Sequence, residues 1–381
     1  MLEFVWQHPI GAAVVLLALL LLQRYLVRTR ERVKIARLGA RPPHVTTYLP
    51  LGIDVALKAI KHTRSGNDLG HWKHMFSHGR FSCHTVEVHA GRQRFIFTAD
   101  PENIKAVLAT QFNDYGKGKE FHDDWEPFLG DSIFGTDGEL WHGSRQLIRP
   151  QFVKEKVRDL DIVENHVQSL LSHLDGSGRS VNISALFYRF TLDAATEYLL
   201  GRSCGSLDSP YTEFGEAFVR AQKVQDIRTR IGPLRFLINR VRFFKDIKII
   251  NAFIETFIEA ALTIDPSQLE AVKNPSFLQC LALEGVKDRK VIRDQVVAVL
   301  LAGRDTTAST LSFLFLELSR NPSIFKKLRD EILRKVGKTE RPTYEDLKAM
   351  PYLRSVTNEV LRLYPSVPFN VRSALTFLPM Y

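Results

Sequence analysis

Polar residues interrupt an apolar run at LLAGRDTTASTLSF, residues 300–313. Thr306 follows Ala302 by four residues, so on a helix its hydroxyl can bond to the Ala302 carbonyl or turn outward to hold a water. Gly303 leaves space beside them, and Asp305 adds a carboxylate that can supply protons. Together these residues could form a shallow groove in which a bound small molecule receives protons.

Two further motifs place a pair of polar side chains on one helical face. Trp141 and Arg145, in DGELWHGSRQLIRPQF, offer an indole N–H and a guanidinium to the same anion, although a Trp–Arg stack on a surface helix has the same spacing. Glu359 and Arg362, in TNEVLRLYPSVP, can form an ion pair on a short helix that stops at Pro365. Exposed pairs of this kind are common and contribute about 0–1 kcal/mol, so this motif alone assigns no function.

The first motif lies in a long predicted helix. Residues 288–320 contain no proline and are followed by Asn321-Pro322, which gives about 50 Å of helix at 1.5 Å per residue. Its middle is apolar on every side, so we expect it to be buried on every side. The alternative is a kinked helix in which the threonines bond to their own backbone and Arg304 and Asp305 form a surface pair.

The other segments predict helices and one hairpin. HTVEVHAGRQRFIFTA, residues 84–99, alternates apolar and polar residues on both sides of Ala90-Gly91, which indicates a β-hairpin. Asp100 and Pro101 then begin a helix as its N-cap and first residue, and the pattern from there to Pro365 is overwhelmingly helical. The sequence predicts a mainly α fold with a small β-sheet region.

The N-terminal segment has the features of a membrane anchor. Its uninterrupted apolar run is Ile10 to Leu22, and residues 24–41 hold seven Arg and Lys against one Glu, a net charge of +6. Positive charge after the run favours an uncleaved anchor with the rest of the chain in the cytosol, over a cleaved signal peptide or a buried helix. We predict three parts: a transmembrane anchor over 1–27, a basic and proline-rich linker over 28–43, and a catalytic domain over 44–381.

Charge and cysteine usage exclude other classes of protein. The net charge is +10, but beyond the basic block it is diffuse and accompanies no zinc-finger spacing, so we expect no nucleic-acid partner. Cys83, Cys204 and Cys280 are far apart and form no CxxC pair, which favours a reducing compartment.

Histidines crowd one segment of the chain in a spacing that fits no standard zinc pattern. We expect solvated or core histidines there and no metal site. The residues concerned are His71, His74, His78, Cys83, His84 and His89.

In this order along the chain, WHGSR, AGRDTT and EVLR resemble motifs of the cytochrome P450 family of haem-thiolate monooxygenases. FTLDAATEYLLG, the anchor and the proline hinge also resemble membrane-bound members. The segments LLAGRDTTAS and NEVLRLYPSVPFNVRSA are most similar in sequence to those of fungal enzymes that hydroxylate n-alkanes and fatty acids. The resemblance extends over essentially the whole chain up to about Leu375.

The resemblance implies a role in cofactor binding for five residues. Trp141, Arg145 and Arg372 would hold the haem propionates. Ala302 and Gly303 would line the groove for dioxygen.

It also implies roles for the remaining motif residues and the partners. Asp305 and Thr306 would deliver the protons that cleave the O–O bond, and Glu359 and Arg362 would brace the fold as an ion pair. Electrons would come from NADPH through a reductase, and the substrate would be a hydrophobic small molecule. The chain would be a single-pass protein of the endoplasmic reticulum membrane. Residues 228–250, where Phe236 and Leu237 alternate with basic residues, resemble a lid that dips into the bilayer, although an ordinary core-facing helix has the same pattern.

One part of the family pattern is missing. The family's haem iron is held by a cysteine thiolate in an FxxGxRxCxG loop downstream of ExxR, whereas all three cysteines here precede Glu359. We therefore expect a cytochrome P450 fold that is C-terminally incomplete, preceded by a transmembrane helix, and inactive as written. The alternative is a non-catalytic, membrane-tethered helical scaffold that binds no haem.

Overall fold

The computed structural model describes residues 43–375, apart from 50–51, 78–83, 91–92, 153–159, 175–177, 179, 210, 271 and 273, together with isolated helical positions between 11 and 37. The predicted anchor and linker therefore lie largely outside the described residues and stay predictions. Among the residues that are described, no helix has both the length and the apolar composition that crossing a bilayer requires. The chain divides into two compact units, residues 1–104 with 230–233 and residues 105–229 with 234–381.

The first unit is built on a small antiparallel sheet. Its elements are α3 (Ile53–Arg64), α4 (Asp68–Phe76), β1 (Thr85–Ala90) and β2 (Gln93–Thr98), followed by α5 (Pro101–Lys105). In β1, Val86 and Val88 are buried against Met75 and Val45, on the apolar face that the alternating pattern predicts. The hairpin is confirmed.

The beginning of α5 follows the sequence as well. The Asp100 carboxylate accepts hydrogen bonds from the backbone N–H groups of Glu102 (2.9 Å) and Asn103 (3.1 Å), and Pro101 is the first helical residue. The predicted N-cap is confirmed.

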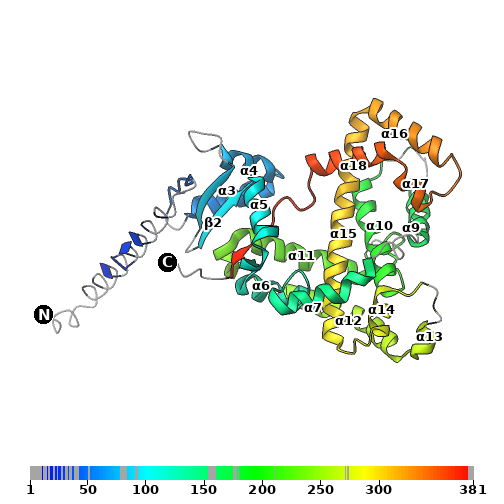
Figure 1. Ribbon diagram of the computed structural model, residues 1–381, viewed down its shortest axis with the longest axis horizontal. Helices are drawn as coiled ribbons and strands as arrows, with labels where there is room; N and C mark the ends of the chain where they lie inside the picture. Colours follow the sequence, from blue (N-terminus) through cyan, green and yellow to red (C-terminus); the bar gives the residue numbers. More distant parts are fainter. Residues whose placement is uncertain are drawn as a thin grey trace. The chain divides into compact units, whose positions relative to one another are not determined.

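The rest of the chain is mainly helical (Figure 1). Its longer elements are α6 (Lys119–Leu129), α7 (Gly138–Ile148), α9 (Asp161–Ser172), α10 (Ile183–Leu200), α11 (Glu213–Ile231), α12 (Val241–Thr263), α14 (Phe277–Leu283), α15 (Arg289–Arg320), α16 (Pro322–Lys335) and α18 (Pro351–Leu363). The shorter ones are α13 (Pro266–Glu270), α17 (Tyr344–Lys348), a π-helical turn at Ala106–Thr110, 3₁₀ turns at Phe112–Asp114, Arg149–Phe152 and Gly232–Leu237, and the paired strands β3 (Tyr115–Gly116) and β4 (Ser373–Ala374).

Helix α15 is the predicted long helix and runs beside α10 in the second unit (Figure 1). The Asp288 carboxylate caps it by accepting from Lys290 N–H, and Pro322 begins the next helix. Its first half is buried in the main core, where Ile292 and Val296 have no exposed surface. At 1.5 Å per residue its 32 residues span about 48 Å.

The expectation that α15 is buried on every side is wrong for its second half. Phe315 and Leu316 are 47% and 38% exposed. Two side chains of this half contact neighbouring segments: Phe315 lies against Phe187 of α10, and Phe313 stacks on Tyr364 at 4.2 Å between ring centroids. A helix that is apolar on all sides can be buried on all sides. Which sides are buried depends on the segments that pack against it.

Candidate functional site

A cavity of about 440 Å³ in the second unit brings together three of the predicted cofactor-binding residues. Trp141 and Arg145 lie on α7, and Arg372 immediately precedes β4. The other polar residues of the wall are Asn113, Tyr115, Lys117, Thr136, Asp137, Glu139, His142 and Asn370, and the apolar ones include Phe112, Ile133, Phe134 and Leu375. The cavity therefore has several cationic groups on an otherwise mixed wall.

Trp141 and Arg145 reach the cavity because they are one helical turn apart. The Arg145 guanidinium lies 5.4 Å from the centroid of the Trp141 ring. The Phe112 ring also contacts Trp141, at 5.1 Å between ring centroids. The Trp–Arg stack that was the simpler interpretation of this motif is thus present. It coexists with a shared cavity, because stacking leaves the edge of the guanidinium available for hydrogen bonds.

Arg372 is brought to the cavity by strand pairing. Tyr115 pairs with Ala374 in the short sheet of β3 and β4, and Leu375 N–H donates to the Asp114 carbonyl at 2.9 Å. The Arg372 guanidinium donates to Asn370 Oδ1 at 2.5 Å, and Lys117 Nζ donates to the same oxygen at 3.2 Å. Sequence spacing alone could not have placed these groups together.

The cavity disfavours its own positive charge. Burial, and then the nearby Arg372, lower the pKa of Lys117 from 10.5 to about 8, with Asp137 acting in the opposite direction. Burial also lowers the pKa of Arg372. Both lowered pKa values mean that the charged Lys117 and Arg372 are poorly solvated in the cavity. An anion there would therefore interact strongly with these two cations.

Sequence reasoning missed Lys117 and Asp137. The Asp137 carboxylate accepts from the backbone N–H groups of Lys117 (2.7 Å) and Gly118 (2.8 Å), so it fixes the segment that carries the lysine. A Cβ added at Gly116 would lie 2.6 Å from that carboxylate. The two glycines around Lys117 in YGKGKE are the sequence signal, because they allow the backbone to approach the half-buried Asp137 carboxylate.

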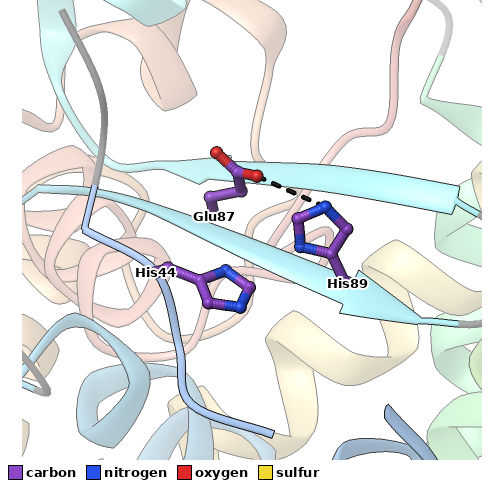
Figure 2. A group of neighbouring side chains, drawn as sticks. All are labelled: His44, Glu87 and His89. Atoms are coloured by element: carbon purple, nitrogen blue, oxygen red, sulfur yellow. Dashed lines mark ion pairs between the residues drawn. The ribbon is translucent and has the colours of Figure 1, made fainter. Parts of the chain in front are cut away.

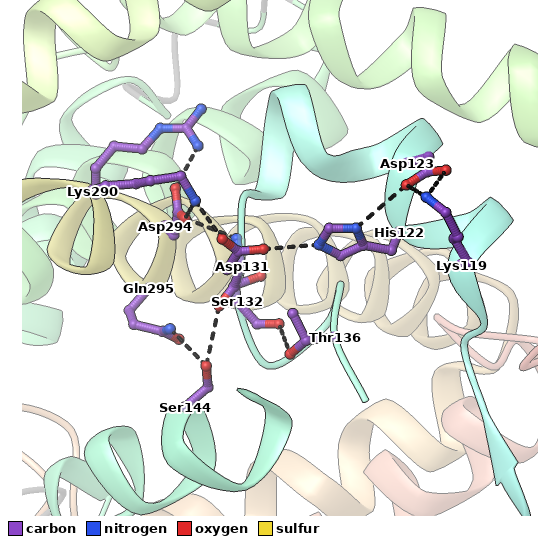
Figure 3. Close-up of polar contacts among 11 residues, drawn as sticks. Lys119, His122, Asp123, Asp131, Ser132, Thr136, Ser144, Lys290, Asp294 and Gln295 are labelled. Carbon is purple, nitrogen blue, oxygen red and sulfur yellow. Dashed lines mark hydrogen bonds and ion pairs between the residues drawn. The ribbon is translucent and has the colours of Figure 1, made fainter. Parts of the chain in front are cut away.

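Helix α7 is fixed to α15 by a polar network (Figure 3). Gln295 of α15 donates to Ser144 Oγ at 2.9 Å, and Ser144 donates to the Asp131 carbonyl at 3.2 Å. The Asp131 N–H in turn donates to the buried carboxylate of Asp294 at 2.8 Å. Because Ser144 lies on the same helix as Trp141 and Arg145, this network positions both of them.

The charges of the network balance one another. Asp294 pairs with Arg293 at 2.7 Å and with Lys290 at 3.0 Å. Hydrogen bonds from Lys290 and then from His122 lower the pKa of Asp131. Gly130 (φ +58°) makes the turn before Asp131 and leaves room for the Asp294 carboxylate.

In α15 the predicted proton-handling residues, Asp305 and Thr306, are hydrogen-bonded within their own helix, and Asp305 also to a neighbouring one. The Thr306 hydroxyl donates to the Ala302 carbonyl at 2.7 Å, which is the self-satisfied arrangement of the simpler interpretation. Thr310 donates to the Thr306 carbonyl at 2.8 Å and its hydroxyl lies 2.9 Å from that of Ser366. Gly303 is exposed.

The Arg304–Asp305 pair is made but is not a surface pair. The two groups are 2.8 Å apart, and Asp305 also accepts from Gln222 of α11. Arg304 is only 7% exposed because the rings of Tyr188 and Phe218 lie at 5.4 and 5.8 Å from its guanidinium. Sequence reasoning missed these aromatic partners, since they come from α10 and α11.

The structure does not bring all predicted site residues into one place. Among the described residues, the lining of the 440 Å³ cavity includes Trp141, Arg145 and Arg372 but not the α15 group of Ala302, Gly303, Asp305 and Thr306.

Glu359 and Arg362 form the predicted ion pair on α18. Two hydrogen bonds of 2.7 Å join them, and Arg362 lowers the pKa of the Glu359 carboxyl. Their side chains are 55% and 66% exposed, so the pair itself stabilises the fold little. Helix α18 is instead held by Glu331 of α16, whose carboxylate accepts from Tyr352 N–H (3.0 Å) and Leu353 N–H (2.8 Å).

Neither of the two described cysteines faces the cavity. Cys204 donates to Asp193 at 3.2 Å, and burial together with that carboxylate raises its pKa to about 12. Cys280 is 5% exposed and lies 3.6 Å from the Pro275 carbonyl. Cys83 and His78 lie outside the described residues.

The cytochrome P450 family model matches residues 65–377. Cytochrome P450 monooxygenase pvhE of Talaromyces variabilis is 43% identical, over 97% of this chain and 72% of its own length. Cytochrome P450 52A1 of Candida tropicalis is 44% identical, over 73% of this chain and 54% of its own. Cytochrome P450 52A4 of Candida maltosa is 41% identical, over 80% and 60%. The chain therefore matches between about half and three quarters of the length of these relatives.

Proposed function

The chain belongs to the cytochrome P450 family, and we propose that it takes part in haem-dependent monooxygenation of a hydrophobic small molecule. The observation that carries the proposal is the convergence of Trp141, Arg145 and Arg372 on one cavity. These are the residues to which the motifs assign the haem propionates, and they come from segments far apart in the sequence.

The donor set of the cavity fits two carboxylates. Arg145 and Arg372 would donate to the propionates in the forked geometry of guanidinium groups, and the Trp141 indole would add a single N–H. Lys117 would contribute a further ammonium, and a propionate beside it would favour its charged form over the neutral one. When bound through a thiolate, haem supplies an iron centre that activates dioxygen for hydroxylation.

The α15 residues would manage protons. Thr306 has a second favoured side-chain rotamer in a helix, in which its hydroxyl leaves the Ala302 carbonyl and can hold a water. The Asp305 carboxylate, held by Arg304 and Gln222, would exchange protons with solvent and pass them to that water. Gly303 keeps the neighbouring surface free of a side chain, so the water could approach the helix backbone.

Neither Cys204 nor Cys280 suits the role of thiolate ligand. A thiol whose pKa is about 12 is protonated at neutral pH, and the Cys280 thiol is buried against a backbone carbonyl. We therefore assign neither of them to iron. Neither of these two thiols should form a thiolate-ligated haem, which is also what the non-catalytic scaffold alternative expects.

A reduced-plus-CO difference spectrum separates the two functions. We compare the 381-residue polypeptide with a version extended past Tyr381 by a cysteine loop of the FxxGxRxCxG type. The monooxygenase proposal expects the thiolate-haem band in the extended version alone. A scaffold would give the band in neither, and that result would remove the proposed function.

Variants of the extended version test the cavity. Arg145→Ala and Arg372→Ala should each lower the amount of haem that stays bound through gel filtration. Arg149→Ala, an exposed arginine just after α7 that does not line the cavity, should retain it. Equal retention in all three variants would mean that the cavity is not the propionate site.

The substrate, location and electron source extend the proposal. We propose n-alkanes or fatty acids as substrates, a single-pass anchor in the endoplasmic reticulum membrane with a cytosolic catalytic domain, and an NADPH-dependent reductase as partner. The apolar run from Ile10 to Leu22 with its basic flank supports the anchor. Phe236 and Leu237, 75% and 67% exposed, support a second contact with the bilayer. Fatty-acid hydroxylation by the extended version with NADPH and reductase in lipid vesicles tests the substrate and the electron source together.

A further inference from the structure

We propose that His44, Glu87 and His89 bind a divalent transition-metal ion of the Zn²⁺ class on the sheet of the first unit. One potential ligand atom from each lies within 4.8 Å of the other two. Figure 2 shows the two imidazoles and the carboxylate gathered beside β1. The proposal is independent of the haem chemistry, because it uses none of the motif residues.

The sheet register explains why three residues so far apart in sequence share one surface. Residues 43–45 run parallel to β1, with Val45 N–H donating to the Glu87 carbonyl and Glu87 N–H donating to the Pro43 carbonyl, both at 2.9 Å. His44 is therefore directly opposite Glu87. Side chains of paired residues lie on the same face of a sheet, and so does His89, two residues beyond Glu87.

The opposite face of the same strand is apolar. Val86 and Val88 alternate with the two ligand residues and pack in the core of the unit. A one-residue slip of register would move Glu87 and His89 into that core, so the burial of the valines fixes the position of the proposed site. The ligands are thus presented by backbone hydrogen bonds rather than by a flexible loop.

The chemistry of the ligand set selects the ion. Two imidazole nitrogens and one carboxylate oxygen suit Zn²⁺, Co²⁺, Ni²⁺ and Cu²⁺, whereas Mg²⁺ and Ca²⁺ prefer oxygen ligands alone. Tetrahedral ligands at Zn²⁺ lie about 3.3 Å apart. His89 Nε2 and Glu87 Oε1 already lie 3.4 Å apart, so it is chiefly His44 that must move closer. His44 is exposed, and its side-chain rotation can supply much of that movement.

Glu87 already has a cationic partner in Arg94, with which an ion would have to share the carboxylate. The carboxylate is 2% exposed, and Arg94 contacts Oε1 at 3.1 Å and Oε2 at 3.2 Å. His89 Nε2 lies 3.4 Å from Oε1. An ion bound through Oε1 would leave Arg94 on Oε2, which is the outer-shell arrangement commonly found behind a ligating carboxylate. With three protein ligands, the remaining position would be filled by water.

The direct test is metal binding by the full-length chain in detergent, purified without a histidine tag and stripped with a chelator. Calorimetric titration with Zn²⁺ should give one site per chain, and Co²⁺ should give the visible absorption of a site with nitrogen and oxygen ligands. His44→Ala and His89→Ala should each weaken Zn²⁺ binding at least about tenfold. His74→Ala is the matched control, since His74 is an exposed histidine of the same unit outside the cluster, and it should leave the affinity unchanged.

A second measurement needs no variant. Zn²⁺ should protect His44 and His89 of the wild-type chain from modification by diethyl pyrocarbonate, read by mass spectrometry, and should leave His74 reactive. The proposal is overturned if the stripped chain takes up no Zn²⁺. It is equally overturned if His74→Ala loses as much affinity as His44→Ala, or if Zn²⁺ leaves the reactivity of His44 and His89 unchanged.

Discussion

Gly130 is the residue at which the structure predicts the largest effect of a single added methyl group. Its backbone has φ +58° and ψ −153°, a conformation that essentially only glycine adopts. A Cβ added there would lie 1.9 Å from the carboxyl carbon of Asp294. Gly130→Ala must therefore both strain the backbone and displace a buried carboxylate.

The two costs can be worked out separately. Backbone strain of this kind costs about 1–3 kcal/mol. Displacing the Asp294 carboxylate removes the hydrogen bond from Asp131 N–H, and a bond to a charged group contributes about 1.5–3 kcal/mol. We expect Gly130→Ala to lower the free energy of unfolding by about 2.5–6 kcal/mol in total.

Gly138→Ala is the matched control. Gly138 has φ +59°, nearly the same as Gly130, but an added Cβ would meet nothing within 4 Å. It should cost only the backbone term, about 1–2 kcal/mol. Urea unfolding of the full-length chain in detergent, followed by tryptophan fluorescence, measures both variants under the same conditions.

Equal costs for the two alanine variants would refute the reasoning, because an added Cβ would meet the Asp294 carboxylate at Gly130 and nothing within 4 Å at Gly138. A double variant sharpens the comparison. When Asp294→Ala has already removed the carboxylate, Gly130→Ala should add only its backbone term, so the two substitutions should be strongly non-additive.

Three further predictions concern other parts of the chain. In the version extended by the cysteine loop, Thr306→Ala should keep haem and substrate binding but divert reducing equivalents to peroxide; unchanged coupling of electron use to product would exclude Thr306 from proton delivery. Deleting residues 1–41 should release most of the chain from membranes, with residual binding through Phe236 and Leu237 that salt weakens; a full-length chain that stays in the supernatant after high-speed centrifugation would contradict the anchor. In the cofactor-free chain, the lowered pKa of Lys117 means that its charge opposes folding below about pH 8 and that this effect is lost by pH 10.5. Lys117→Met should therefore be more stable than wild type at pH 7, and urea midpoints should show that advantage disappear as the pH rises to 10.5.

The elements with marked ends could be predicted from the sequence. Asp288 and Pro322 delimit α15, and the alternating pattern on both sides of Ala90-Gly91 predicted the pairing of β1 with β2, because caps and strand alternation are local signals. Helical spacing likewise placed Trp141 and Arg145 on one face.

The partners of those elements could not be predicted from local pattern. Arg372 reaches the cavity through pairing of strands from opposite ends of the second unit, and only the family resemblance anticipated its role. Lys117 belongs to none of the motifs in the sequence, although the glycine before it allows a close contact with Asp137. The histidine-rich segment 71–89 has no zinc spacing along the chain. The strand register instead brings His89 close to His44, which lies outside that segment.

The pairing of β3 with β4 also has a consequence for the order in which the protein is made. One wall of the cavity comes from residues 112–145 and the other from residues 370–375. Chains fold from the N-terminus as they leave the ribosome, and closing so long a loop is slow compared with forming local helices. The wall that carries Trp141 and Arg145 therefore stays open to solvent until almost 230 further residues have been synthesised and the second wall can pair with it. A cofactor held from both sides would be captured only after translation has passed Arg372, so its insertion would be a late step of biogenesis.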